Sequence, residues 1–335
     1  MLAAIPYNDA DWNTIRSFKE NLPMFAIETV ALEKTYTVGF WRKATRQALR
    51  PLTLAVPEHE VFGFLGPNGA GKTTTLKLLM GLIFPTGGTA KILGKNVDDP
   101  QVKAQIGYSP EQPYFYDYLT AQELLRYYAQ LSEVPAKEQE KRVSAVLDRV
   151  GLRDIGRLQL RKFSKGMLQR VSIAQAIVHN PQLVFLDEPM SGLDPMGRRE
   201  VRDLIQALKE EGKTIFFSTH ILSDAETLCD RVAVVNKGEL KGIGSVAELK
   251  SRGTGESEVV WEGAEAIREM ERLSSQVHRS ADFWRAVVAE SDVFASVELV
   301  RRHGGTLISV TPVRETLEDY FFERLNAPNV QEVRR

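Results

Sequence analysis

The chain has 335 residues, of which 43% are hydrophobic and 26% are charged, and its formal net charge is −1. A chain of this length is expected to form two domains, and the apolar content is sufficient for packed cores. The near-neutral balance excludes a protein that binds nucleic acid through its overall charge. The single cysteine, Cys229, excludes an internal disulfide framework and favours a reducing compartment.

The sequence has no apolar run close to the roughly 18 residues that a membrane span requires. Its N-terminus also lacks the basic start and continuous apolar core of a secretory signal. If the protein acts at a membrane, another chain is expected to do the crossing. Residues 1 to about 23 are polar and end at Pro23. We expect them to form a loosely docked extension, whose removal with a start at Met24 leaves folding intact.

Strand-like sequence begins after Met24, with apolar residues at Phe25, Ile27, Val30 and Leu32. Residues 61–65 form a short apolar run that is typical of a buried strand. A glycine-rich turn follows at 66–71, and residues 73–80 are predicted to be a helix.

Residues 119 to about 180 are predicted to be mostly helical. Thr120 followed by Glu123 has the pattern of a capping box at a helix start. Apolar side chains then recur at helical spacing, first at Leu124, Leu125, Tyr128 and Leu131, and again at Val143, Val146, Leu147 and Val150.

Strands and helices alternate after Pro181. The pattern predicts strands at 183–186, 214–217 and 232–235, a helix at 199–211 and a second helix from Ser223. This alternation favours a largely parallel sheet.

The character of the sequence changes near residue 241. Residues 242–245, Gly-Ile-Gly-Ser, are predicted to be a linker. The last ~90 residues are predicted to hold strands at 259–261 and 306–310 and helices near 264–276, 292–303 and 314–325. The final helix would carry an apolar stripe that must be buried, formed by Leu317, Phe321 and Leu325.

The residues 66–73, Gly-Pro-Asn-Gly-Ala-Gly-Lys-Thr, match the phosphate-loop pattern G-x-x-x-x-G-K-[ST] between a predicted strand and helix. Glycines let backbone N–H groups turn inward around phosphates, and the helix adds its positive end. Lys72 is expected to reach the β- and γ-phosphates of ATP, and the Thr73 hydroxyl to bind Mg²⁺. The predicted ATP-binding residues here are Gly66, Pro67, Asn68, Gly69, Ala70, Gly71, Lys72, Thr73 and Thr74.

Two carboxylates follow the apolar run 183–186. This run delivers Asp187 to the edge of the sheet, where its carboxylate can hold Mg²⁺ directly or through water. Glu188 lies one residue further and is expected to face the attacking water. Alone, such a pair would be read as surface carboxylates at a strand end, but beside a phosphate loop the catalytic reading is favoured.

Further motifs resemble those of the ABC ATPase family. Phe163-Ser-Lys-Gly-Met-Leu-Gln-Arg resembles its signature motif, whose common form is L-S-G-G-Q. Ser191-Gly-Leu-Asp194 resembles the D-loop, and Ser218-Thr-His220 resembles the switch histidine. Tyr36 lies where the family has an aromatic ring under the adenine. The motifs occur in the family's order over residues 25 to about 245.

The resemblance implies an α/β fold with the P-loop NTPase core of the ABC ATPase type. Such a core has a mixed sheet with helices, an antiparallel β subdomain and a helical signature subdomain, here at about 112–180. It would span residues 24–245, and a small α+β accessory domain would follow at 246–335. The implied cofactors are ATP and Mg²⁺.

The resemblance also implies roles for individual residues. Lys72, Glu188 and His220 would be catalytic, and Asp194 would act in the D-loop. The signature residues Ser164, Lys165, Gly166 and Met167 would act on ATP bound by a second subunit. Lys165 and Met167 replace the usual Gly and Gln, whereas the Ser164 hydroxyl and the Gly166 amide, which touch the γ-phosphate in the family, remain.

One motif position stays open between two residues. Alignment on Pro110 puts Glu111 where the family usually has the Q-loop glutamine, and Gln112 is next. Either could reach Mg²⁺ or the attacking water. The predicted metal ligands are therefore Thr73, Asp187 and Glu111, and both Glu111 and Gln112 are predicted to lie at the ATP site.

Within the family, the sequence is similar to ATP-binding subunits of bacterial exporters of the antibiotic-resistance, Nod-factor and sodium-extrusion type, relatives of the lipid-exporting ABCA class. The features that carry this likeness are the S-K-G-M signature, the Ser109-Pro-Glu-Gln loop and the ending Glu315-Thr-Leu-Glu-Asp-Tyr-Phe. It implies a second ATPase subunit, most simply in a homodimer, and separate membrane permease subunits at the cytoplasmic face of the cell membrane. No nucleic-acid partner is expected.

Several alternatives are weighed against this prediction. A soluble ABC ATPase without a permease is disfavoured, because repair-type members insert a long coiled coil and ribosomal members carry two ATPase cores. A non-hydrolysing ABC protein would be expected to lack Glu188 or Lys72. The cationic stretch at 40–50 is more simply a solvated hairpin beside the adenine than a nucleic-acid or membrane patch. The other histidines are expected at the surface or in packing: His59, His179, His278 and His303.

Overall fold

The computed structural model describes residues 24–38, 44–251, 253–263, 268–280 and 283–314. The predicted extension at 1–23, the tip of the first hairpin and the last predicted helix lie outside these residues. By contact density the chain divides into two compact units, one of residues 1–220 with 235–240 and one of residues 221–234 with 241–335. Within the described part, no helix is long and apolar enough to cross a bilayer.

A six-stranded sheet carries the phosphate-loop strand near its middle. The strand order is β10-β9-β3-β8-β7-β6, and the β3–β8, β7–β8 and β6–β7 pairs are parallel. Every residue of β3, β7 and β8 is buried, as expected for parallel strands covered on both faces. The strand bounds are β3 Val61–Leu65, β6 Ile106–Ser109, β7 Leu183–Asp187, β8 Thr214–Thr219, β9 Arg231–Asn236 and β10 Glu239–Ser245.

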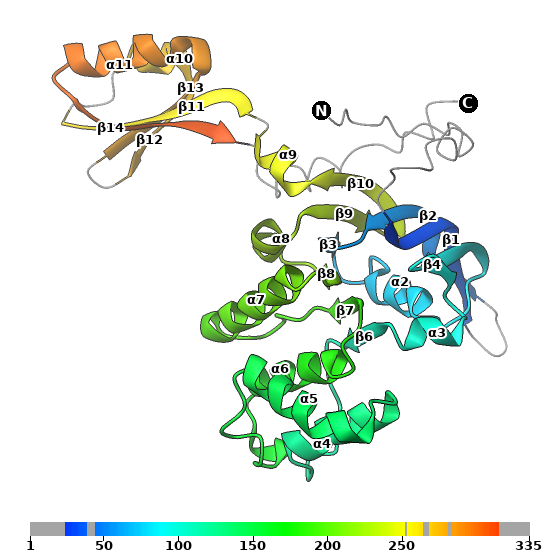
Figure 1. Ribbon diagram of the computed structural model, residues 1–335. Helices are drawn as coiled ribbons and strands as arrows, with labels where there is room; N and C mark the ends of the chain where they lie inside the picture. The colour runs from blue at the N-terminus through cyan, green and yellow to red at the C-terminus, as the bar shows by residue number, and fades with distance from the viewer. Residues whose placement is uncertain (1–23, 39–43, 252, 264–267, 281–282, 315–335) are drawn as a thin grey trace. The chain divides into compact units, whose positions relative to one another are not determined.

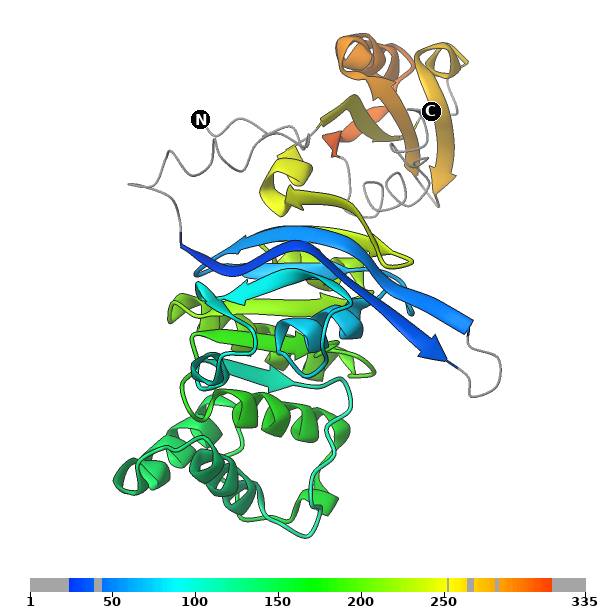
Figure 2. The same ribbon diagram turned by 90° about the vertical axis from the view of Figure 1, so that its right-hand side faces the viewer.

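A four-stranded antiparallel sheet has the order β2-β1-β4-β5. Figure 2 shows its longest part, the bent ribbon of β1 and β2. The two strands pair antiparallel from Phe25↔Pro57 to Val38↔Ala44 with several register shifts. The bounds are β1 Phe25–Val38, β2 Ala44–Pro57, β4 Gly87–Ile92 and β5 Lys95–Asn96.

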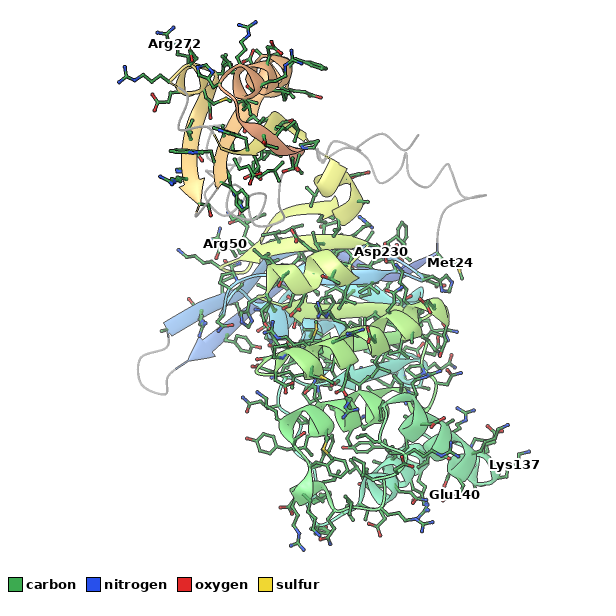
Figure 3. All side chains as sticks on the ribbon, turned by 90° about the vertical axis from the view of Figure 1, so that its left-hand side faces the viewer. Met24, Arg50, Lys137, Glu140, Asp230 and Arg272 are labelled. Atoms are coloured by element: carbon green, nitrogen blue, oxygen red, sulfur yellow. The ribbon has the colours of Figure 1, made fainter. Side chains whose placement is uncertain are left out.

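Three helices form the predicted helical subdomain, at the end of this unit marked by α4, α5 and α6 in Figure 1. The capping box at Thr120 is confirmed, because its hydroxyl accepts from the Glu123 N–H while the Glu123 carboxylate accepts from the Thr120 N–H. The outer face of α5 is polar, and Figure 3 shows Lys137 and Glu140 at the edge of this subdomain, where the Glu140 carboxylate pairs with Arg126 of α4. The bounds are α4 Ala121–Leu131, α5 Ala136–Arg149, the 3₁₀ turn η1 Leu160–Lys162 and α6 Lys165–Ile177.

The remaining helices of the first 251 residues connect the strands. The helix α7 begins at Pro195, four residues before the predicted start, because Asp194 caps it and proline suits the first helical position. The bounds are α2 Lys72–Leu79, α3 Pro100–Lys103, α7 Pro195–Glu210, α8 Leu222–Leu228 and α9 Val246–Ser251.

The C-terminal part has the chain order β11-α10-β12-β13-α11-β14 and the strand order β12-β13-β11-β14. This is the split βαβ arrangement of ferredoxin-like domains. Both helices cover the same face of the sheet in Figure 1, and Trp261, Val288 and Val300 are buried in its core. The bounds are β11 Gly253–Glu262, α10 Met270–Leu273, β12 Ser274–Ser280, β13 Phe283–Ala289, η2 Glu290–Asp292, α11 Val293–Arg302 and β14 Thr306–Arg314.

Two predictions for this region are wrong. Residues 242–245 are not a linker but the end of β10, because Gly242 and Gly244 sit within a paired edge strand. The predicted helix at 264–276 is reduced to α10 within the described residues, since 274–276 belong to β12 and pair with β13. The predicted strands at 259–261 and 306–310 and the helix at 292–303 are confirmed. The predicted helix at 314–325 lies outside the described residues except for Arg314, which ends β14.

Candidate active site

The phosphate loop follows β3 and leads directly into α2. Gly71 caps this helix with φ 105°, a left-handed conformation that favours glycine. A Cβ at this position would lie 2.6 Å from the carbonyl oxygen of Ala48 on β2. The first turn of α2 contains no acidic residue, so its N-terminal N–H groups remain favourable for an anion.

Lys72 crosses the loop from the start of α2. Its ammonium group donates to the Gly66 carbonyl at 2.7 Å and lies 3.0 Å from Oε1 of Glu188. The side chains of Lys72 and Glu188 are both only 7% exposed. A buried cation with a partner of this kind can exchange its carboxylate for a phosphate oxygen without becoming unpaired.

Asp187 lies at the end of β7 and receives two hydroxyl groups. Thr73 Oγ1 donates to Oδ2 at 3.0 Å, and Ser218 Oγ donates to Oδ1 at 2.5 Å. The residue as a whole is 2% exposed. The structure thus brings the predicted metal residues Thr73 and Asp187 together at the mouth of the phosphate loop.

The donors at this point fit Mg²⁺. A hydroxyl and a carboxylate oxygen are hard ligands, and Mg²⁺ in phosphate sites commonly takes one or two protein oxygens and completes its shell with phosphate and water. The 3.0 Å contact between Thr73 and Asp187 leaves both groups beside the loop that would hold the phosphates.

Glu188 occupies an unusual backbone conformation just after β7. Its φ is 49°, in the left-handed region, and its N–H donates to the Ser218 carbonyl at 3.1 Å. Such strain in a non-glycine residue is a common feature of functional sites. With this turn, Oε1 faces Lys72 at 3.0 Å while Oε2 lies 2.8 Å from Nδ1 of His220. Lys72, Glu188 and His220 therefore form one cluster, although they lie far apart in the sequence.

Tyr108 on β6 is close to the acidic side of this cluster. Burial, followed by the negative charges of Asp187 and Glu111, raises the pKa of its hydroxyl to about 12. Glu111 and Gln112 are both exposed. No hydrogen bond or ion pair joins either of them to Thr73 or Asp187 in the described structure, so the choice between them stays a prediction.

The signature stretch begins α6. Ser164 caps this helix and its hydroxyl accepts from the Met167 N–H at 3.2 Å. The side chain of Lys165 lies over Gly192, where an added Cβ would be 3.3 Å from Cε of the lysine. Asp194 accepts from the Gly197 N–H at 2.8 Å and caps α7. These contacts join the signature and the D-loop within one chain.

Tyr36 lies on β1 opposite Arg46 of β2. The ribbon of these strands passes the phosphate loop, since Ala48 lies against Gly71. The ammonium of Lys34 lies 5.2 Å from the centre of the Tyr36 ring. A flat, half-buried ring on this ribbon is suited to stacking on a nucleobase.

A family model described as ABC transporter matches residues 49–191. The chain is also 46% identical over 301 residues to an uncharacterized ABC transporter ATP-binding protein of Synechocystis. The aligned residues cover 89% of this chain and 84% of that protein. The chain belongs to the ABC transporter ATP-binding proteins. It is therefore an ATPase with the predicted ABC-type P-loop fold.

Other relatives of this ABC ATPase extend the likeness. A fluoroquinolones export ATP-binding protein of Mycobacterium tuberculosis is 42% identical over 210 residues, which cover 62% of this chain and 68% of that protein. Among solved structures, a dimeric ATP-binding cassette in a post-hydrolysis state with ADP and Pi is 27% identical with a TM-score of 0.60, over 66% of this chain and 98% of that chain. An ATP-binding subunit of an ABC transporter is 32% identical with a TM-score of 0.59, over 67% and 92%.

Two features of the ABC ATPase site escaped the sequence analysis. The first is Ser218, which was read only as part of the switch-histidine motif, although its hydroxyl links Asp187 to the Glu188 N–H. Its place at the end of an apolar strand beside β7 was the available signal. The second is a hydroxyl pair between Ser109 and Ser172, which no motif marks because the two residues meet only through packing.

Proposed function

We propose that this ABC ATPase is the energising subunit of an exporter, acting as a head-to-tail dimer on separate permease subunits at the cytoplasmic face of the membrane. The observation that carries the proposal is the buried cluster in which Glu188 lies between Lys72 and His220. It holds the groups that in-line attack of water on a γ-phosphate requires, namely a base, a phosphate-binding cation and a second γ-phosphate contact.

In this mechanism Lys72 moves its charge from Glu188 to the β- and γ-phosphates when ATP enters the loop. Glu188, still oriented by His220, then accepts the proton of the attacking water. The backbone N–H groups of the loop and the start of α2 stabilise the charge that builds up on the phosphate oxygens. Mg²⁺ held by Thr73 and Asp187 would supply further neutralisation of the phosphates.

The dimer is supported by the exposure of the signature. Ser164 and Lys165 are solvent-exposed at the start of α6, and their contacts are with α6 and the D-loop rather than with the chain's own phosphate loop. In the proposed dimer this surface completes the partner's ATP site. ATP then becomes part of the interface, so that its binding favours the closed state and its hydrolysis favours the open one.

The permease is supported by an aromatic surface beside the helical subdomain. Tyr114 is 91% exposed, and the exposed rings of Tyr116 and Tyr118 are 5.9 Å apart. These residues follow the loop at 110–112 and precede α4, so a partner bound there would contact the segment that joins the ATP site to the helices. Exposed apolar groups of this kind mark interaction sites. The export direction rests on the relative from Mycobacterium tuberculosis.

Glu188→Gln tests the proposal directly. The amide cannot accept the proton of water, so we expect ATP turnover to fall at least about 100-fold, in the range for a lost general base. ATP binding should persist, and the blocked opening step should trap a dimer. Phosphate release and size-exclusion chromatography with ATP and Mg²⁺ measure the two effects.

Glu210→Gln is the matched control, because it makes the same chemical change on the exposed side of α7. It should hydrolyse ATP like the wild type and remain in the wild-type monomer–dimer balance. Wild-type turnover by Glu188→Gln would remove this residue from the role of base. A Glu188→Gln protein that is inactive but stays monomeric with ATP would contradict the dimer.

A further inference from the structure

The helix α6 packs unusually closely on the strand β6. A Cβ at Gly107 would overlap the carbonyl oxygen of Ala176, so the two backbones are almost in contact there. Two residues along the strand lies Ser109, and one turn back along the helix lies Ser172. Their hydroxyl oxygens are 2.7 Å apart, and both side chains are 0% exposed. The small residues at four facing positions allow this approach.

The hydroxyl pair lies between two functional segments. Ser109 is the last residue of β6 and is followed at once by the loop at 110–112. Ser172 lies about two helical turns after Ser164, which caps α6 at the signature. The end of β6 is also near the chain's own carboxylates, since Asp187 and Glu111 both act on the pKa of Tyr108. The pair therefore joins a strand that ends beside the chain's own ATP site to the helix that begins at the signature. In the proposed dimer, the signature acts on the ATP bound by the partner.

The two serines respond differently to loss of the partner. A buried hydroxyl group is destabilising unless it is hydrogen-bonded. In a helix, a serine can turn its hydroxyl to the carbonyl four residues earlier, as Ser296 does to Asp292 at 2.8 Å. Ser172 thus has a local substitute, whereas a strand residue such as Ser109 has no carbonyl at that spacing. Removing Ser172 should therefore destabilise the protein more than removing Ser109.

We propose that the Ser109–Ser172 hydrogen bond is a positioning contact that couples the loop at 110–112 to the signature helix. With it, the state of a chain's own ATP site is transmitted to the placement of Ser164 and Gly166 against the partner's ATP. Neither serine touches the nucleotide, and both act through the elements they join. The inference rests on the proposed dimer.

Three variants test it: Ser109→Ala, Ser172→Ala and the double change, each made in the wild type and in Glu188→Gln. ATP affinity of the monomer should be unchanged in all three, because the phosphate loop is untouched. In the Glu188→Gln background, ATP-driven dimerisation should weaken about fivefold in all three, the change that corresponds to one buried hydrogen bond of ordinary strength. In the wild-type background, turnover at a fixed low protein concentration should fall and the KM for ATP should rise with it, because ATP binding and dimerisation are linked.

The melting temperatures should follow a different order. Ser172→Ala leaves a buried unpaired hydroxyl on Ser109 and should melt lowest, whereas the double variant removes both hydroxyls and should recover part of the loss. The dimerisation defect should not recover with it. If dimerisation instead follows the melting temperature across the three variants, or is unchanged in all of them, the coupling role is wrong and the pair is structural only.

Thr29→Val is the matched control, since it removes another buried hydroxyl, which donates to the Leu52 carbonyl at 2.9 Å in the antiparallel sheet. It should lower the melting temperature without changing dimerisation. The parent Glu188→Gln protein separates the two proposals, because it retains both serines. If the parent fails to dimerise with ATP, the dimer falls and this inference falls with it. If the parent dimerises and the serine variants match it, only this inference is overturned.

Discussion

At the scale of single residues, each charged side chain of the site is held by an ion pair or by hydrogen bonds to a neighbouring side chain. Lys72 and Glu188 neutralise each other in a nearly dry environment, and Thr73 and Ser218 donate to opposite oxygens of Asp187. Every buried charge in the cluster thus has a partner, which avoids the large cost of an unpaired buried ion. The same arrangement allows ATP to enter by exchange of partners rather than by creation of new charges.

Tyr108 provides a prediction of pH dependence in this cluster. Burial first, then Asp187 and Glu111, raise the pKa of its hydroxyl from 10.0 to about 12 in the folded state. The folded protein therefore holds this proton more tightly than the unfolded chain, and the associated stability is present below pH 10 and is lost as the pH rises from 10 to 12. In Tyr108→Phe the loss of stability between pH 10 and pH 12 should be smaller than in the wild type by about 1–2 kcal/mol. This is less than the full free energy of a shift of two pKa units, because the tyrosine ring is only partly buried and solvent screens the effect.

Urea unfolding at neutral pH and at a pH between those two pKa values measures the difference. Tyr118→Phe, at a ring that is 60% exposed, is the control and should follow the wild type. Equal losses in Tyr108→Phe and the wild type would show that another group causes the alkaline destabilisation.

At the scale of elements, success in prediction depended on whether a pattern was local. The sequence predicts well those features that are formed by adjacent residues, namely the phosphate loop, the capping box at Thr120 and the buried runs of β3 and β7. The strand β12, Ser-Ser-Gln-Val-His-Arg-Ser, has almost no apolar alternation and exists because β13 pairs with it. The contacts of Glu188 with Lys72 and His220 required the strand order, which places β7 and β3 on either side of β8.

The close approach of β6 and α6 gives a prediction for Gly107. Its added methyl group would overlap the Ala176 carbonyl, and a backbone atom cannot move aside as a side chain can. Gly107→Ala should therefore lower the free energy of unfolding by about 1–3 kcal/mol, the usual range for overpacking. Chemical denaturation measures the change.

Gly244→Ala is the comparison, because that strand glycine has ordinary space, with the nearest atom, Cδ1 of Leu249, 3.5 Å from the added Cβ. It should change stability by less than about 0.5 kcal/mol. A Gly107→Ala protein as stable as Gly244→Ala would mean that α6 can shift away from β6 at little cost, which would also weaken the case for the serine contact.

At the scale of the whole molecule, the ATPase residues and the ferredoxin-like part have separate cores. All groups of the candidate site precede residue 221, whereas Val259, Trp261 and Val300 belong to the C-terminal cluster. The ferredoxin-like part also carries exposed apolar side chains, including Phe294 on α11 at 88% and Ile308 on β14 at 46% exposure. Such groups favour a role in contact with another surface.

A chain ending at Ser251 tests whether this part contacts the second subunit. This end point retains β10, which a cut at residue 245 would leave at its very end. We expect turnover per molecule to match the full-length protein at high protein concentration and to fall at low concentration. The concentration for half-maximal turnover should rise about tenfold, as for a lost contact worth about 1.4 kcal/mol. Equal specific activity of both proteins over the whole range would contradict the dimer contact.

The stacked pair Trp261 and Trp284, with ring centres 6.5 Å apart, has a spectroscopic consequence. The chain contains four tryptophans, and none lies between residues 42 and 260. The parallel sheet and the helical subdomain therefore contribute no tryptophan fluorescence. The indole rings that the structure describes belong to the C-terminal core. In a variant with Trp12→Phe and Trp41→Phe, which removes the other two tryptophans, an unfolding curve recorded by this emission would follow the ferredoxin-like part, while far-ultraviolet circular dichroism would follow mainly the ATPase core. A difference between the two midpoints would measure how independently the two parts melt.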